Sequence, residues 1–196
     1  SGASVTMPLK ENVKELLDEI DPVAQKIGAV NTLFFRKGKV KGFNTDCIGA
    51  LNAIEEQSGL VIGKKIVILG AGGAAKAIVY EACKRGAKVV ILNRRSEKAQ
   101  QLANQFNCEG YGLESIHEIY QQGYDILINC TPSSMPIEPQ YILEKAVIMD
   151  IVSKPKETPF LQEAIKIGCQ VIFGYDMFIN QAKEQHQIWF FDSTHK

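Results

Sequence analysis

The chain has 196 residues, of which 45% are hydrophobic, and its 22 basic and 22 acidic side chains give a formal net charge of zero. A balanced charge argues against nucleic acid or an anionic membrane surface as the main partner, and no apolar run is long enough to cross a bilayer. Five scattered cysteines without a C-x-x-C pair predict reduced thiols in a cytoplasmic protein, and the histidines form no ligand-spaced cluster that would indicate a metal site.

The first 57 residues combine short extended and helical segments. Asp21-Pro22 fits a helix N-cap followed by proline at the first helical position, and Arg36-Lys37-Gly38 fits a hairpin turn. The elements predicted here are, in chain order, a helix over 10–17, a helix beginning at Pro22, strands over 29–35 and 39–43, and a helix from 45 or 46 through 54 or as far as 57.

Strands and helices alternate from residue 65 onward. The predicted strands cover 65–69, 88–92, 109–112, 125–129, 146–150 and 170–174, and the predicted helices cover 73–85, 96–106, 158–167 and 175 to about Phe191. This alternation predicts an α/β protein with a doubly wound, parallel Rossmann-type sheet, whose ligand binds at the carboxyl ends of the strands.

A glycine-rich turn follows the first of these strands, in Val67-Ile68-Leu69-Gly70-Ala71-Gly72-Gly73-Ala74-Ala75. Gly70 permits the tight turn, while Gly72 and Gly73 leave no Cβ between the backbone and a pyrophosphate. The free N–H groups and the dipole at the start of the next helix attract phosphate. The pattern predicts a dinucleotide site; methyltransferases and flavoproteins use similar turns, and a glycine-rich loop without ligand is the alternative.

Basic residues end the second strand of this unit, in Asn93-Arg94-Arg95 with Lys98 one turn further on. NAD enzymes carry here an acidic residue that accepts a hydrogen bond from the ribose 2′-hydroxyl, and this carboxylate would repel the 2′-phosphate of NADP. Arginine instead pairs with phosphate and stacks on adenine. These residues predict NADP; the alternative is a solvated basic loop before a helix capped by Ser96.

Lys10 and Asp46 are the candidates for chemistry in the first part of the chain. Oxidation of a secondary alcohol releases a hydride and a proton, which a lysine amine can carry while a carboxylate orients both the lysine and the hydroxyl. On these residues alone the pairing is weakly indicated, and the favoured alternative is an N-cap role for Asp46 and a surface position for Lys10.

A series of motifs in this order resembles the shikimate dehydrogenase family. The substrate side carries Val5-Thr6-Met7-Pro8-Leu9-Lys10, Gly28-Ala29-Val30-Asn31-Thr32 and Gly42-Phe43-Asn44-Thr45-Asp46, similar to the family's V-T-x-P-x-K, G-A-V-N-T and G-x-N-T-D. The cofactor turn and Asn93-Arg94 follow in the family's order, and after them come Asn129-Cys130-Thr131-Pro132, Thr158-Pro159-Phe160-Leu161 and the segment Gly174 to Ala182, similar to G-x-x-M-x-x-x-Q-A.

This resemblance implies NADP-dependent, reversible oxidation of shikimate to 3-dehydroshikimate in aromatic amino-acid biosynthesis. Lys10 would transfer the proton and Asp46 would hold Lys10, while Thr6, Asn31 and Gln181 would bind the hydroxyls of shikimate. The implied NADP-binding residues are Gly70, Ala71, Gly72, Gly73, Ala74, Asn93, Arg94, Arg95, Lys98, Thr131, Ile151, Gly174 and Met177. It also implies a division into 1–57 (the C-terminal part of a smaller α/β substrate domain), 58–174 (the NADP-binding domain) and 175–196 (a helix returning to the substrate domain).

Departures from the family pattern qualify these expectations. The chain begins abruptly at Ser1, which suggests a piece of a longer protein that lacks the family's paired serines for the substrate carboxylate, so we expect NADP binding with little shikimate turnover. Ser153 and Ser134 replace the family's tyrosine and glycine. Quinate or another cyclic polyol is an alternative substrate, a non-catalytic NADP(H)-binding regulatory module is an alternative function, and Ser4 suggests fusion to a dehydroquinase domain.

Overall fold

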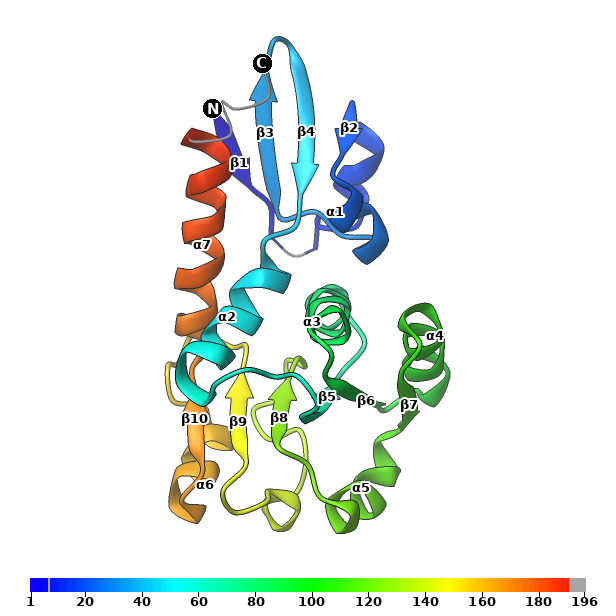
Figure 1. Ribbon diagram of the computed structural model, residues 1–196, viewed down its shortest axis with the longest axis vertical. Coiled ribbons are helices and arrows are strands. Elements are labelled where there is room, and N and C mark those ends of the chain that lie inside the picture. Colours follow the sequence, from blue (N-terminus) through cyan, green and yellow to red (C-terminus); the bar gives the residue numbers. More distant parts are fainter. Residues whose placement is uncertain (7, 191–196) are drawn as a thin grey trace.

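The computed structural model describes residues 1–6 and 8–190, which form two sheets joined by helices (Figure 1). The smaller sheet has the order β1-β3-β4-β2, built from β1 (Gly2–Ser4), β2 (Glu19–Ile20), β3 (Thr32–Arg36) and β4 (Lys39–Phe43). β3 and β4 form the predicted hairpin, and Lys37 and Gly38 between them have φ angles of 50° and 78°. Such a two-residue turn in the left-handed region matches the twist of an antiparallel pair.

The larger sheet is six-stranded and entirely parallel, with the order β10-β9-β8-β5-β6-β7. Its strands are β5 (Lys65–Leu69), β6 (Lys88–Asn93), β7 (Glu109–Gly112), β8 (Ile126–Asn129), β9 (Val147–Asp150) and β10 (Gln170–Ile172). The strand order reverses beside β5, which is the doubly wound arrangement, so the predicted fold class is confirmed.

Both faces of the central part of this sheet are buried, and alternate residues of β5, β6, β8 and β9 enter different cores. Ile66 and Ile68 of β5 pack with α2 (Asp46–Ser58), α3 (Gly73–Lys84) and α4 (Ser96–Phe106). Val67 and Leu69 pack with α5 (Ile116–Gln122) and α6 (Pro159–Ile167) on the other face. Burial on both sides explains why these four strands are largely apolar, whereas the edge strand β7 (Glu109–Gly112) is not.

Two long helices connect the sheets. α2 leaves the hairpin toward the larger sheet, and α7 (Gly174–Phe190) runs back beside it to the smaller one (Figure 1). A Cβ on Gly49 of α2 would lie 2.6 Å from the Cβ of Gln181 in α7, so only glycine allows this close approach. α1 (Pro22–Ile27) adds a small core with α2 and α3 around Ile27, Cys47 and Ala77.

Several predicted boundaries differ from the structure. The helix predicted over 10–17 is a short 3-10 helix, η1 (Asn12–Leu16), and β3 begins at Thr32 because the backbone N–H of Val30 bonds instead to Lys10. The strand predicted to 174 ends at Ile172, and Gly174 begins α7. α5, β1, β2 and the short 3-10 helices η2 (Leu113–Ser115) and η3 (Pro139–Tyr141) were not predicted, and the expected helix end near Phe191 lies outside the described residues.

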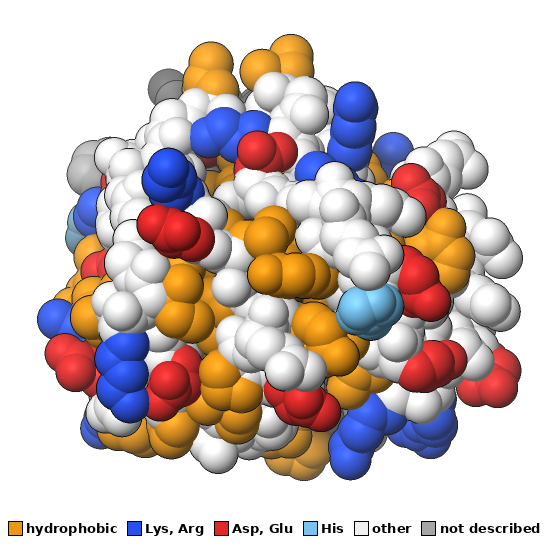
Figure 2. All heavy atoms as spheres, turned by 90° about the horizontal axis from the view of Figure 1, so that it is seen from below, with side chains coloured by type: hydrophobic (Ala, Val, Ile, Leu, Met, Phe, Trp, Pro, Cys, Tyr) orange, Lys and Arg blue, Asp and Glu red, His pale blue; other side chains and the backbone are white. Residues whose placement is uncertain are grey.

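The end of the molecule formed by the larger sheet's helices presents basic and acidic side chains interspersed among apolar ones (Figure 2). Within residues 1–6 and 8–190, no helix combines the length and apolarity needed to span a membrane.

Candidate active site

A cleft of about 350 Å³ lies between the two sheets and brings together residues from distant parts of the chain. All five predicted catalytic and substrate-binding residues line it, and so do four of the predicted cofactor residues. These nine are Thr6, Lys10, Asn31, Asp46, Ala74, Ile151, Gly174, Met177 and Gln181. The other predicted cofactor residues lie outside this cleft: Gly70, Ala71, Gly72, Gly73, Asn93, Arg94, Arg95, Lys98 and Thr131.

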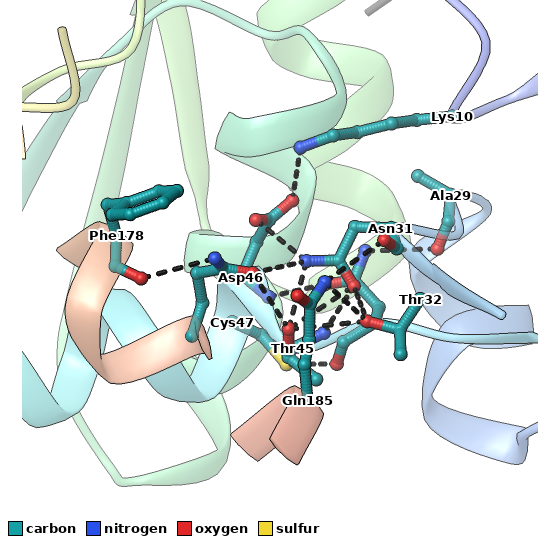
Figure 3. A network of polar contacts seen from close by, with 11 residues as sticks. Lys10, Ala29, Asn31, Thr32, Thr45, Asp46, Cys47, Phe178 and Gln185 are labelled. Atoms are coloured by element: carbon teal, nitrogen blue, oxygen red, sulfur yellow. Dashed lines mark hydrogen bonds and ion pairs between the residues drawn. The ribbon is translucent and has the colours of Figure 1, made fainter. Parts of the chain in front are cut away.

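Lys10 and Asp46 form an ion pair inside the cleft. Lys10 Nζ donates to Asp46 Oδ2 at 2.6 Å, and the two side chains are 20% and 8% exposed (Figure 3). Lys10 is anchored through its carbonyl, which accepts a hydrogen bond from the N–H of Val30, and Asp46 is the first residue of α2. The structure therefore places an ammonium and a carboxylate together at the cleft, where either can act on a bound hydroxyl.

Asn31 fixes the orientation of the Asp46 carboxylate. Its Nδ2 donates to Asp46 Oδ1 at 2.9 Å and to Thr45 Oγ1 at 3.0 Å, while its Oδ1 accepts from the backbone N–H of Thr45 and the hydroxyl of Thr32. Asn44 Oδ1 accepts from the N–H of Asp46. With both carboxylate oxygens engaged, the side chain of Asp46 has little freedom to rotate.

One face of α7 closes the cleft with residues spaced four apart: Met177, Gln181 and Gln185. Gln181 Oε1 accepts from Thr45 Oγ1 at 3.2 Å. Gln185 is buried and donates to the carbonyl of Asn31 and the hydroxyl of Thr32, while it accepts from Ser4 Oγ at 2.9 Å. Sequence reasoning missed the position of Gln185, although its helical spacing from Gln181 was a usable signal.

The glycine-rich turn leaves space above the start of α3. Gly70 has φ +108°, and a Cβ there would lie 3.1 Å from the Thr131 side chain. Among the described residues, nothing lies within 4 Å of a Cβ built on Gly72, which precedes the first residue of α3, and the first turn of α3 contains no acidic residue. The open backbone N–H groups at a helix start fit a pyrophosphate.

Asn129 holds the neighbouring loop against this turn. Its Oδ1 accepts from both the N–H and the Oγ1 of Thr131, at 2.9 and 2.8 Å. Asp150, at the end of the next strand, accepts from the N–H of Val152 and from Thr158 Oγ1. Burial raises the pKa of Asp150, and these hydrogen bonds only partly oppose the effect.

Arg94 and Arg95 follow β6 at the same edge of the sheet and are exposed, as is Lys98. Neither guanidinium forms an ion pair within the part of the chain that the structure describes. Ser96 is the first residue of α4 and not its N-cap, which is Arg95 without a side-chain capping bond. The basic side chains are therefore free to bind a phosphate.

An ion pair between Glu11 and Lys76 also lies at the start of α3 and was not anticipated from the sequence. Lys76 Nζ is 3.2 Å from Glu11 Oε1, and the same oxygen lies 3.8 Å from the position that a Cβ on Gly73 would take. A carboxylate next to Lys10 thus faces the turn where a pyrophosphate would bind.

Comparison with known proteins gives matches along most of the chain. Residues 53–162 match the family model described as shikimate / quinate 5-dehydrogenase, and residues 1–33 match the shikimate dehydrogenase substrate binding domain. The NADP(+) shikimate dehydrogenase of Methanococcus maripaludis is 40% identical, with 96% of this chain and 72% of that protein covered.

Two further relatives extend this similarity. A bifunctional 3-dehydroquinate dehydratase/shikimate dehydrogenase of Arabidopsis thaliana is 37% identical, over 96% of this chain and 35% of that protein. The crystal structure of shikimate 5-dehydrogenase from Thermus thermophilus in complex with NADP(H) and shikimate superimposes with a TM-score of 0.88 at 33% identity, covering 96% of this chain and 72% of that one.

Proposed function

The chain belongs to the shikimate dehydrogenase family, and we propose that it catalyses the NADP-dependent, reversible oxidation of shikimate to 3-dehydroshikimate. The observation that carries this proposal is the Lys10–Asp46 pair at 2.6 Å, in a cleft that also reaches Ala74 at the start of the cofactor helix. A proton carrier in a cleft that reaches the start of a cofactor helix is what an alcohol dehydrogenase requires.

Lys10 is proposed to carry the proton of the reacting hydroxyl. Bound NADP supplies the hydride acceptor, which is the chemistry that this chain lacks. The Lys10 amine receives the hydroxyl proton at Nζ, and Asp46 stabilises the resulting ammonium through its Oδ2. In the reverse direction Lys10 returns the proton to the oxygen of the ketone.

Shikimate hydroxyls are proposed to bind Thr6 and Gln181 at the rim and Asn31 deeper in the cleft. The contact from Asn31 Nδ2 to Gln181 Oε1 is 3.4 Å long, which makes it the longest hydrogen bond of this amide nitrogen. A substrate hydroxyl that inserts here can donate to Gln181 Oε1 and replace this weak contact, while both hydrogens of Asn31 Nδ2 stay engaged with Thr45 and Asp46. An analogue that lacks this hydroxyl leaves Gln181 without that partner and is discriminated against.

The proposed NADP site runs from the glycine-rich turn to the end of β6. Gly70 to Ala74 would surround the pyrophosphate, where Gly72 leaves open space, and Thr131 would line the loop above it. Arg94, Arg95 and Lys98 would bind the 2′-phosphate, with Asn93 shaping their loop through its hydrogen bond to the carbonyl of Arg95. Ile151, Gly174 and Met177 would line the path toward the cleft.

The test is the absorbance of NADPH formed from NADP with shikimate or with quinate, alongside a separate NADP-binding titration. It uses a protein that carries this chain together with the part of its relatives' length that the chain does not span, because the chain covers 72% of the Methanococcus maripaludis enzyme. Lys10→Ala should lower kcat by about 100- to 10,000-fold, which is the range for loss of a general acid–base group, and should leave NADP binding unchanged. Lys26→Ala removes an exposed lysine of α1 and serves as the control.

Four outcomes would contradict the proposal in different ways. NADP binding without turnover of either acid favours the regulatory module, and turnover of quinate alone favours the alternative substrate. A preference for NAD would refute the role of Arg94. Equal activity of Lys10→Ala and the unmodified protein would remove Lys10 from the mechanism.

We also propose a cytoplasmic location, supported by the five cysteines, all of which are free thiols as expected in a reducing compartment. Cell fractionation with an antibody to the chain tests it, and recovery in a secreted fraction would contradict it. Fusion to a dehydroquinase domain stays a prediction.

A further inference from the structure

Cys83 and Cys108 line a second cavity, of about 500 Å³, away from the active-site cleft. Cys83 lies in the last turn of α3 and Cys108 immediately precedes β7, so both belong to the edge of the sheet where its strands begin. The cleft described above lies at the opposite edge, where the strands end. Nothing in the proposed reaction uses these two thiols.

The fold brings the two thiols to the wall of one cavity, although 25 positions separate them in the sequence. Hydrogen bonding between the two side chains perturbs the pKa of each. Both residues are partly exposed, so a small reagent can reach them from the cavity. The hydrogen bond lowers the pKa of the Cys83 thiol and, together with burial, raises that of Cys108, which makes Cys83 the more readily ionised of the two.

The backbone on either side of the pair is fixed. The carbonyl of Cys83 accepts from the N–H of Gly86 at 3.0 Å, and the N–H of Cys108 donates to the carbonyl of Ala103 at 3.0 Å. Each thiol therefore lies on backbone that a hydrogen bond at the end of a helix holds in place. Glu109, which lines the same cavity, raises the pKa of Cys108.

The other three cysteines differ from this pair. Burial raises the pKa of Cys47 to about 12 and also raises the pKa values of Cys130 and Cys169. None of the three lines the cavity that contains Cys83 and Cys108. A thiol-specific reagent should therefore distinguish the pair from the rest.

We propose that Cys83 and Cys108 form a dithiol site that converts to an intramolecular disulfide by exchange with a small-molecule disulfide. The Cys83 thiolate attacks one sulfur of the reagent, forms a mixed disulfide and releases one thiolate. Cys108, after loss of its proton, attacks the Cys83 sulfur and releases the second thiolate. The two protein thiols lose two electrons and two protons, and the small disulfide is reduced to two thiols.

Glutathione disulfide is the probe, and intact-protein mass spectrometry with peptide mapping is the measurement. We expect the native chain to lose two hydrogen atoms and to yield a Cys83–Cys108 crosslinked peptide. Cys108→Ser should stop at the mixed disulfide, with one glutathione on Cys83, because no second thiol is present to release it. Cys169→Ser, the control, should still form the crosslink.

Two results would overturn the proposal. One is a native chain that keeps a stable glutathione adduct or gains no modification while its thermal unfolding shows that it is folded. The other is a crosslink between a different pair of cysteines. The experiment on the native chain needs no variant, so it tests the proposal even if the Cys108→Ser protein folds poorly. Cys108→Ala provides the same measurement as Cys108→Ser.

Discussion

Gly49→Ala should loosen the substrate side of the cleft by pushing α7 away from α2. The added Cβ would lie 2.6 Å from the Cβ, 2.7 Å from the backbone N and 2.9 Å from the Cα of Gln181, whereas ordinary contacts begin at 3.4 Å. Two of these three atoms belong to the backbone, so the side chain of Gln181 cannot simply rotate away. The helices must separate by about 0.8 Å locally.

Two opposing effects decide the outcome of this substitution. Replacing glycine by alanine within a helix favours the helix by about 1 kcal/mol, and overpacking a close contact costs about 1–3 kcal/mol. At this helix pair we expect overpacking to dominate, which lowers the Tm by up to roughly 8 °C for a chain of this size. Displacement of Gln181 also opens its 3.2 Å contact with Thr45, and misplacing a binding group by about 1 Å can lower kcat/KM by about 100-fold.

Thermal unfolding followed by circular dichroism and shikimate kinetics at saturating NADP measure the two effects separately. Gln187→Ala, at an exposed position of α7, is the control and should change neither quantity. A Gly49→Ala protein with a raised Tm and unchanged kcat/KM would show that helix propensity dominates and would refute the argument from close approach.

Three further predictions concern stability, pH and cofactor affinity. Arg85→Met leaves the buried Glu81 carboxylate, which Arg85 Nε binds at 3.0 Å, without its main partner, and should lower the free energy of unfolding by about 3 kcal/mol in denaturant titrations. Burial raises the pKa of Asp150 above its ordinary 3.8, so the stabilising effect of this carboxyl is full below pH 3.8 and is lost as pH rises through the raised pKa. As pH rises through this range, the free energy of unfolding should therefore increase for Asp150→Asn relative to the unmodified protein. Glu11→Gln removes a negative charge from the pyrophosphate turn and releases Lys76, which should tighten NADP binding about two- to fivefold in fluorescence titrations.

Matched controls separate these effects from nonspecific ones. Lys84→Met removes the exposed partner of Glu81 and should cost less than about 1 kcal/mol. Glu15→Gln removes an exposed charge on η1 and should leave NADP affinity unchanged. A flat pH response in the Asp150→Asn comparison, equal losses for Arg85→Met and Lys84→Met, or weaker NADP binding by Glu11→Gln would each contradict the corresponding reasoning.

The sequence was sufficient for most of the larger sheet because the strands other than β7 contain apolar runs bounded by turn residues. β7 (Glu109–Gly112) is not apolar and was predicted from its place in the alternation of strands and helices, and it has the predicted ends, as does the helix over 96–106. α5 was missed because it has only seven residues and buries only Ile116 and Ile119, too little for a helical period. β1 and β2 are three and two residues long, so their pairing partners define them more than their own sequences do.

The site also combines features that the sequence predicts with features that depend on distant contacts. Lys10 and Asp46 could be predicted because each belongs to a recognisable motif, but the distance between them depends on how Asn31 orients the carboxylate. Gln185 and Glu11 were not predicted because their partners lie far away in the sequence. Cys83 and Cys108 were predicted as separate thiols for the same reason, and only the packing of α3 against the start of β7 joins them.

The path of α7 limits how the two sheets can move. The chain crosses to the larger sheet along α2 and returns along α7, whose far end is tied to the small sheet by Trp189 Nε1 donating to the carbonyl of Leu33 at 2.9 Å. Because α2 and α7 pack along each other and both connect the two sheets, a displacement of one sheet relative to the other has to bend or shift both helices together.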